Sequence, residues 1–237
     1  MSEEKRDSFI LYRIAIEEFE KEFKSANAEL AEWEKINHYQ RDKLIGTSED
    51  IIGFSKIFSD IHLSTKALLI KDTQLMSENF GSLKFIQERS QSKEYKSLIS
   101  NEEALKVAYK GYFYFIRAFQ DAVYGVLLNL LDENIGQSMK GMKKALKDSS
   151  PVNKWILEID GYKEWFLEFR EKRNKIKIGV RFNIRGPQWD PGVGFSIPTK
   201  DGGTSSGTDS VKIMDLIKAI DMSAEALKLI RQKLKDV

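Results

Sequence analysis

The chain has 237 residues, 41% hydrophobic and 31% charged, which is ordinary for a globular protein with a real core. Lysine and arginine number 38 against 36 for aspartate and glutamate, which gives a net charge of +2. This excludes nucleic-acid binding through the charge of the whole chain, so any nucleic-acid site must be a local basic patch. The absence of cysteine excludes disulfides, thiolate nucleophiles and cysteine-ligated zinc, and it fits a cytoplasmic protein.

A seam of apolar residues predicts a long first helix over about residues 4–39. Its members alternate spacings of three and four: Phe9, Tyr12, Ile16, Phe19, Phe23, Ala26, Leu30 and Trp33. Such a seam packs either within its own domain or against a second subunit. The many aromatic positions favour the first, because they suit irregular globular packing.

Residues 47–100 predict several shorter pieces. Thr47–Asp50 is typical of a helix start, and further pieces fall at about 63–69 and 75–89, the second with a break at Gly81. The polar stretch 90–100 is expected to be a connection. It would join an N-terminal helical part, residues 1–95, to a bundle of residues 100–237 within one domain, 1–237.

The strongest predicted helix runs over 101–133 and opens with a capping box of Ser100 and Glu103. One face carries Leu105, Ala108, Tyr112, Phe115, Phe119, Val123, Val126 and Leu130. Arg117 and Asp121 lie four apart within it, so they form a structural ion pair or meet partners on a later helix. Since charges in mid-membrane are rare, this apolar stretch predicts a buried helix and no membrane span.

The next segment, 136–148, is short and basic. Its lysines share a face that is either solvated or in contact with phosphates: Lys140, Lys143, Lys144 and Lys147. Ser150 followed by Pro151 predicts a capped helix start, which leads to Gly161.

Residues 165–179, WFLEFREKRNKIKIG, predict a helix with functional side chains. Arg170, Asn174 and Lys177 lie on one stripe, beside a second stripe that includes Trp165, Phe169 and either Lys172 or Arg173. The first stripe gathers two cations and an amide. The alternative is an ordinary amphipathic helix whose basic last turn suits the helix dipole.

The pattern changes after this helix. Alternation with period two predicts a small β-hairpin over 180–198, on which Arg181 and Arg185 project from the same side. The glycine-rich stretch 199–209 lacks the residues of a phosphate-binding Walker loop. Asp209 or Ser210 then caps a last helix that reaches about residue 235. The predicted class is therefore all-α: a bundle of long helices with a small β-hairpin before the C-terminal helix.

The order of these elements resembles the HEPN superfamily of helical nucleotide-binding and ribonuclease-like domains. The resemblance rests on Arg173 and Asn174 near the end of a late helix, followed by Gly179, a short extended segment and one last helix. The family signature places a histidine about four to six residues after the arginine. No histidine stands at those positions here, counted from either Arg173 or Arg170.

The resemblance implies a homodimer with two motif helices across a shared cleft, in a prokaryotic defence or toxin–antitoxin-like setting. The candidate catalytic residues that it implies, which would also hold a phosphate, are Arg170, Arg173, Asn174 and Lys177. Further phosphate or RNA contacts would come from Lys172, Arg181 and Arg185, with Arg117 and Asp121 behind the site. Active members are metal-independent ribonucleases in which the histidine handles a proton, and Lys177 cannot easily replace it, because lysine has a pKa of about 10.4.

We therefore expect a protein that binds RNA, a nucleotide or a protein partner, with degenerate catalysis. An active metal-independent ribonuclease and a structural helical interaction scaffold are the alternatives. Only two histidines are present, His38 and His62, and the sequence contains no metal-binding or cofactor motif, so no metal and no cofactor are expected.

Overall fold

The computed structural model describes residues 8–33, 37–131, 141–146, 150, 152–176, 181–182, 195–196 and 213–236. Helices dominate these residues, so the predicted all-α class is confirmed. The elements are α1 (Ser8–Ala31), α2 (His38–Glu78), α3 (Leu83–Gln91), α4 (Lys93–Leu130), α5 (Gly141–Ala145), α6 (Asn153–Ile156), α7 (Tyr162–Ile176), β1 (Arg181–Phe182), β2 (Phe195–Ser196) and α8 (Ile213–Asp236).

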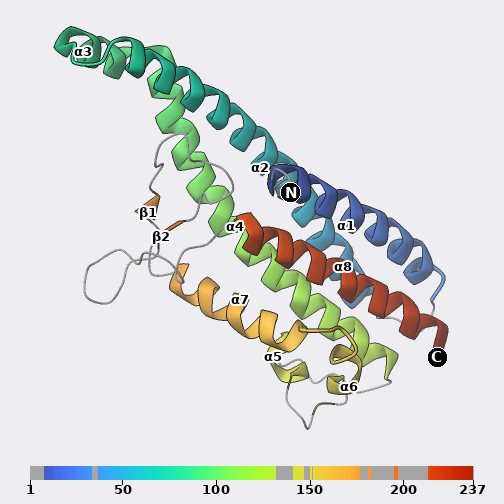
Figure 1. The fold of residues 1–237 in the computed structure, drawn as a ribbon. Coiled ribbons are helices and arrows are strands. Elements are labelled where there is room, and N and C mark those ends of the chain that lie inside the picture. Colours follow the sequence, from blue (N-terminus) through green and yellow to red (C-terminus); the bar gives the residue numbers. More distant parts are fainter. Residues whose placement is uncertain are drawn as a thin grey trace, which may run out of the picture.

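The helices form a bundle around α4 from which one pair of helices projects (Figure 1). Helix α2 runs antiparallel to α4 along most of its length, α1 packs chiefly on α8, and α8 also packs on α4. Helix α7 lies along the C-terminal half of α4, with the short helices α5 and α6 near the same end. The core is strongly aromatic, as in the edge-to-face pair of Phe19 and Phe119, whose ring centroids are 5.5 Å apart.

The predicted seam of the first helix is confirmed, because its residues from Phe9 to Leu30 are buried. They pack within the chain, chiefly on α8, as the aromatic seam favoured. The predicted end near residue 39 is wrong. Helix α1 ends at Ala31, and the Asn37 side chain accepts a hydrogen bond of 2.9 Å from the Tyr39 N–H, which caps a new helix.

The predicted helix start at Thr47 is also wrong, because α2 is one continuous helix of 41 residues. The hydroxyls of Thr47 and Ser48 donate to carbonyls of the preceding turn, at 2.8 Å to Lys43 and 2.7 Å to Leu44. They therefore bond within the helix and do not cap it. The predicted break at Gly81 is confirmed: α2 ends at Glu78, and Gly81 has a φ of 87°, a conformation that favours glycine.

The predicted connection over residues 90–100 and the capping box at Ser100 are wrong as well. Ser92 caps α4, since its hydroxyl accepts a 3.1 Å hydrogen bond from the Tyr95 N–H, and Ser100 lies inside the helix. Only Ser92 separates α3 from α4. The predicted division between residues 95 and 100 thus falls within the first turns of α4, whose other end belongs to the bundle core.

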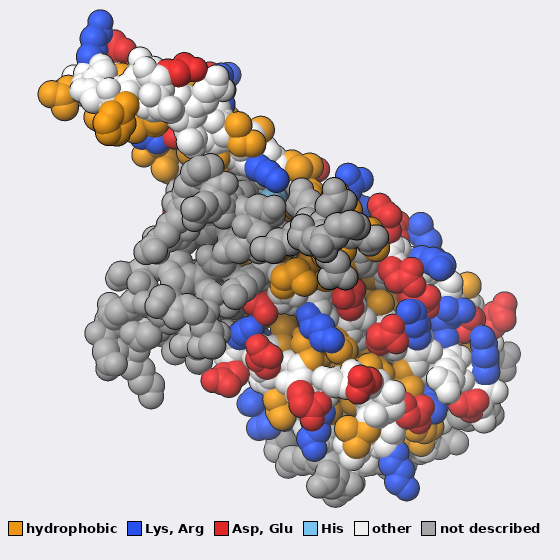
Figure 2. Space-filling view, viewed as in Figure 1, with side chains coloured by type: hydrophobic (Ala, Val, Ile, Leu, Met, Phe, Trp, Pro, Cys, Tyr) orange, Lys and Arg blue, Asp and Glu red, His pale blue; other side chains and the backbone are white. Residues whose placement is uncertain are grey.

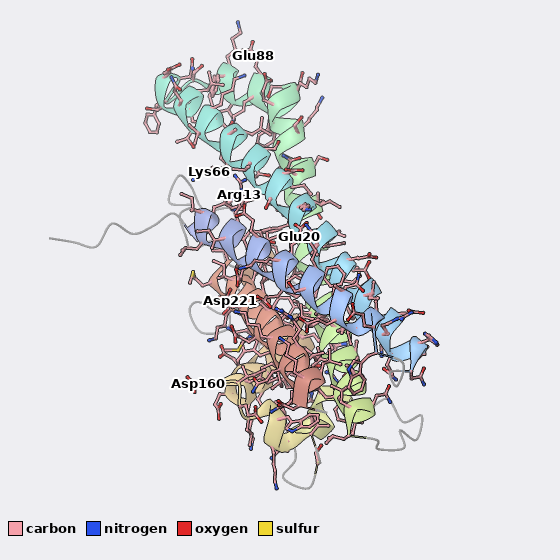
Figure 3. The ribbon with its side chains drawn as sticks, turned by 90° about the vertical axis from the view of Figure 1, so that its right-hand side faces the viewer. Arg13, Glu20, Lys66, Glu88, Asp160 and Asp221 are labelled. Atoms are coloured by element: carbon pink, nitrogen blue, oxygen red, sulfur yellow. The ribbon has the colours of Figure 1, made fainter. Side chains whose placement is uncertain are left out.

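We call residues 63–104 the arm. There α2 and α4 extend beyond the bundle as an antiparallel pair, and α3 lies at the tip, from which Glu88 projects (Figures 1 and 3). Among the described side chains of the arm, only Thr65, Leu69 and Leu98 are buried. Polar contacts hold it together, notably the Arg89 guanidinium, which donates to both oxygens of Asp72 at 2.7 and 2.6 Å.

The two long helices approach closely at Gly111 of α4. A Cβ built on Gly111 would lie 2.7 Å from the Phe54 ring of α2, so this position requires glycine unless the ring moves. The freed space lets Phe54 pack on Phe115, with ring centroids 4.8 Å apart. The predicted apolar face of this central helix is buried, apart from Phe115, which is half-buried.

The C-terminal half follows the sequence more closely. The predicted buried face of α8 is confirmed: Ile213, Leu216, Ile217, Ile220, Ala224, Leu227 and Ile230. Helix α7 begins after Gly161, whose φ is 67°, three residues before the predicted start. The predicted Ser150 side-chain cap is wrong, because α6 begins at Asn153 with no side-chain cap, and only the Ser150 carbonyl accepts from the Asn153 N–H.

Strands β1 and β2 pair antiparallel, Arg181 with Ser196 and Phe182 with Phe195. The rest of the predicted hairpin, 180–198, lies outside the described residues, so the hairpin remains a prediction. The stretch 199–209 also lies outside them, as do Lys140 and Lys147. Across the described helices, none combines the length and apolar character that a membrane crossing needs.

Candidate functional site: an arginine cluster between α4 and α7

Two stripes of side chains face each other where α7 packs on α4. Helix α4 contributes Tyr114, Arg117 and Asp121 at spacings of three and four, and α7 contributes Phe166, Arg170 and Arg173 at the same spacings. We call Arg117, Arg170 and Arg173 the arginine cluster. Below it, the ring of Phe169 stacks on Phe113 of α4 with centroids 4.9 Å apart, which fixes α7 in place.

Arg117 is the most enclosed member of the cluster. Its side chain is 15% exposed, its Nη1 lies 2.8 Å from Oδ1 of Asp121, and its guanidinium lies 5.2 Å from the centroid of the Phe166 ring. Burial is the main reason why the pKa of Arg117 is lowered, Asp121 raises it, and the charges of Arg173 and Arg170 lower it further. The predicted ion pair is confirmed, and two more cations act on it.

Arg173 lies against Tyr114 near the C-terminal end of α7. Its guanidinium carbon is 5.3 Å from the ring centroid, within the range of a cation–π contact. The Arg173 Nε is buried and has no hydrogen-bond partner among the described residues. The exposed Tyr114 ring thus holds the Arg173 guanidinium through a cation–π contact, which places the charge without neutralising it.

Asp121 is shared between two roles. Besides pairing with Arg117, its Oδ1 accepts a 3.0 Å hydrogen bond from the Met142 N–H, in the first turn of α5. A carboxylate suits a helix N-terminus, so Asp121 ties α5 to α4. Its single negative charge cannot neutralise three arginines.

The balance of charge at this surface is therefore positive. Within the described part of the chain, no carboxylate forms an ion pair with Arg170 or Arg173. Lys110 is exposed on α4, one turn before Tyr114, and adds a further cation to the same stripe. Guanidinium groups held close together despite mutual repulsion provide donors for an oxyanion such as a phosphate.

The other predicted site residues are distributed differently. Lys172 lies away from the cluster, where its Nζ contacts Asp215 of α8 at 2.8 Å and Glu168 at 2.7 Å, so its charge is already compensated. Asn174 is exposed on the last turns of α7. Lys177 and Arg185 lie outside the described residues, and for Arg181 only the backbone pairing in β1 is described.

A buried hydrogen-bond network positions the two helices. The Gln120 Nε2 donates to the Ser223 hydroxyl of α8 at 3.0 Å, and the Tyr162 hydroxyl of α7 donates to Gln120 Oε1. All three side chains are fully buried. The sequence interpretation missed this network and Tyr114; the available signals were a glutamine on an apolar helix face and a tyrosine three residues before Arg117.

The cluster brings together donors suited to an anion, and neither α4 nor α7 contains a histidine within its described residues. His62 is buried between α1 and α2, where it stacks on Phe9 at 4.7 Å between ring centroids, and His38 is the first residue of α2. No group of three or more metal-ligating side chains occurs among the described residues. Comparison of the chain with protein-family models, with curated proteins and with solved structures finds no match.

Proposed function

We propose that this protein binds RNA or a nucleotide through phosphate groups at the arginine cluster, and that it does not cleave what it binds. The observation that carries the proposal is the meeting of Arg117, Arg170 and Arg173 on two helices around the single carboxylate of Asp121. Because the net charge of the whole chain is only +2, such a local excess is what nucleic-acid binding would require.

Arginine suits this role for two reasons. Its planar guanidinium donates hydrogen bonds to two phosphate oxygens at once, and it stays charged even when its pKa is lowered by burial. The Arg173 guanidinium and the exposed Tyr114 ring beside it offer a phosphate contact next to a surface on which a base can stack.

The absence of cleavage follows from the chemistry of the residues. Attack by a 2′-hydroxyl needs a group that accepts its proton near neutral pH, and the late helix has no histidine. The proposal includes the HEPN-like assignment and a cytoplasmic defence or toxin–antitoxin-like setting. It also includes a hairpin over 180–198 that supplies Arg181 and Arg185. An active ribonuclease remains the rival hypothesis.

The test compares wild type with an Arg170→Ala, Arg173→Ala variant. Binding of fluorescein-labelled single-stranded RNA and of a tRNA pool is measured in EDTA at salt concentrations from about 50 to about 200 mM. Over this range, binding through phosphate contacts loses affinity steeply. Each phosphate contact contributes about 0.7 to the slope of log affinity against log salt for single strands, so the variant should flatten the slope by about 1.4.

Lys172→Ala is the matched control. It removes a cation from the same helix, but the charge of Lys172 is already paired with Asp215. We expect it to leave the slope unchanged. Equal slopes for wild type and the double variant would refute the proposal. RNA fragments that appear in EDTA with wild type, and not with the double variant, would establish the ribonuclease instead.

A further inference from the structure

The arm, residues 63–104, carries apolar side chains that its own fold leaves uncovered. Exposed hydrophobic residues lie along both helices and at the tip: Leu63, Ile70, Leu75, Phe80, Leu83, Ile86 and Ile99. Figure 2 shows hydrophobic side chains at the surface of the tip. Phe80 is 92% exposed and Leu83 is 79% exposed. With only two buried leucines, the arm has almost no core of its own.

Three of these residues share one side of the arm. Leu63 and Ile70 are seven residues apart and so lie on the same side of α2. Ile70 directly follows the buried Leu69, and Ile99 directly follows the buried Leu98. Each residue along a helix is rotated by about 100° around the helix axis. Because α2 and α4 are antiparallel and their buried leucines face each other, the next residue of each helix, Ile70 or Ile99, lies on the same side of the pair.

The register between the helices places these side chains next to one another. Asn101 Nδ2 donates to the Ser64 hydroxyl at 3.1 Å, and Lys71 pairs with Glu94 at 3.1 Å. In this register Ile99 falls between Leu63 and Ile70 along the arm. Lys66 lies on the same side of α2, three residues after Leu63 and four before Ile70. We call Leu63, Ile70 and Ile99 the apolar side of the arm.

We propose that the arm joins two copies of this chain, with the apolar side of one arm packed on that of the other. Two helical pairs that meet in this way form a four-helix bundle, which gives each apolar side the second layer it lacks. In a two-fold arrangement the same patch meets itself, so one self-complementary side is sufficient. This proposal concerns a different surface from the arginine cluster and does not depend on RNA binding.

The charge of the arm favours a second copy over nucleic acid or an anionic membrane. Residues 63–104 contain six lysines and arginines and six aspartates and glutamates, so two arms meet without net repulsion. A nucleic-acid or anionic lipid surface would instead select a basic excess. This balance therefore allows a second copy of the chain and disfavours a strongly anionic partner.

The size of the arm is also sufficient. At about 1.5 Å per residue, the sixteen residues of α2 within the arm span about 24 Å, and two helices of about 10 Å width make a side of roughly 500 Å². Two copies would bury about 1,000 Å² in total, which reaches the lower limit of specific interfaces.

The experiment measures the mass of the full chain by light scattering after gel filtration, across a concentration series. We expect wild type to reach about twice 27.3 kDa, and an Ile70→Glu, Ile99→Glu variant to dissociate at least tenfold more readily. Leu157→Glu is the matched control, because Leu157 is 48% exposed outside the arm, and it should remain a dimer.

Cross-linking provides a second readout that does not disturb the apolar side. The chain contains no cysteine, so a single Ile99→Cys substitution gives one defined thiol, which should cross-link to its copy with a short bismaleimide, while Leu157→Cys should not. A wild type that stays at the mass of one chain would overturn the proposal and leave the arm to a different protein. A dimer that persists in the double glutamate variant would overturn it and place the interface elsewhere.

Discussion

The guanidinium carbon of Arg173 lies 5.3 Å from the centroid of the Tyr114 ring, so an aromatic side chain of α4 holds the arginine near the end of α7. Such a contact at a half-exposed site contributes about 0.5 to 1 kcal/mol. The ring orients Arg173 without neutralising it. A substitution of Tyr114 therefore changes the position of the charge, whereas a substitution of Arg173 removes the charge.

Tyr114→Leu should therefore weaken RNA binding by about two- to fivefold at fixed salt and leave the salt dependence unchanged, because no charge is lost. Arg173→Ala should weaken binding and also flatten the salt dependence. Both are measured by fluorescence anisotropy. Tyr39→Leu, at a tyrosine that is 61% exposed in the first turn of α2, is the control. A Tyr114 variant with unchanged affinity would show that the ring does not serve the site.

Asp121→Asn should increase the affinity for RNA. The substitution removes the carboxylate that pairs with Arg117 and keeps an oxygen that can accept from the Met142 N–H, so α5 stays attached. A gain of severalfold at low salt that fades at high salt is expected, since it arises from charge. Asp121→Ala serves as the comparison, because it removes the hydrogen bond as well. Weaker binding by Asp121→Asn, with an unchanged melting temperature, would contradict the anion-binding role.

The network of Gln120, Tyr162 and Ser223 should contribute to stability more than to binding. Gln120→Leu leaves the buried Tyr162 hydroxyl without its acceptor, which costs about 1 to 3 kcal/mol. Adding Tyr162→Phe removes that unsatisfied hydroxyl, so the double variant should be more stable than the sum of the single losses predicts. Urea unfolding of the three variants measures this. Additive losses would mean that the two side chains act independently.

A pH dependence is expected from Glu20, which lies between α1 and α2 (Figure 3). Its carboxylate is 3.1 Å from the Lys24 ammonium and 3.3 Å from that of Lys56, and hydrogen bonds to these two lysines lower its pKa from 4.5. A lowered pKa in the folded state stabilises the fold above pH 4.5, and this stabilisation is lost as the pH falls through the folded-state value.

Glu20→Gln should thus cost about 0.2 to 1 kcal/mol at pH 7, the range of a partly exposed ion pair. The difference from wild type should shrink as the pH is lowered below 4.5. Thermal unfolding at several pH values measures it, with the exposed Glu17→Gln as the control. A difference that does not change with pH would assign the effect to packing.

The sequence predicted those helices whose apolar residues repeat strongly. The seam of α1 and the face of α8 are correct because every third or fourth residue is large and apolar, and such residues are buried whatever they pack against. The Arg117–Asp121 pair was predictable for a similar reason, since both partners belong to one helix.

The errors have a common physical origin. Thr47, Ser48 and Ser100 have the side chains of helix caps, but each lies inside a long helix, where a hydroxyl can bond to its own backbone. The arm was not predicted because its helices bury little, so their periodicity is weak. That α7 faces α4, and that Tyr114 meets Arg173, depends on long-range packing that local spacing does not determine.

Helices α2 and α4 continue unbroken from the bundle into the arm, while nearly all of the buried residues stay in the bundle. The length of the arm can therefore change without disturbing the packing of the bundle core. Inserting or removing seven residues in both helices would preserve the sides that they present and move the tip by about 10.5 Å. In the proposed dimer, the distance between the two bundles could thus be changed by whole heptads while each bundle stays as it is.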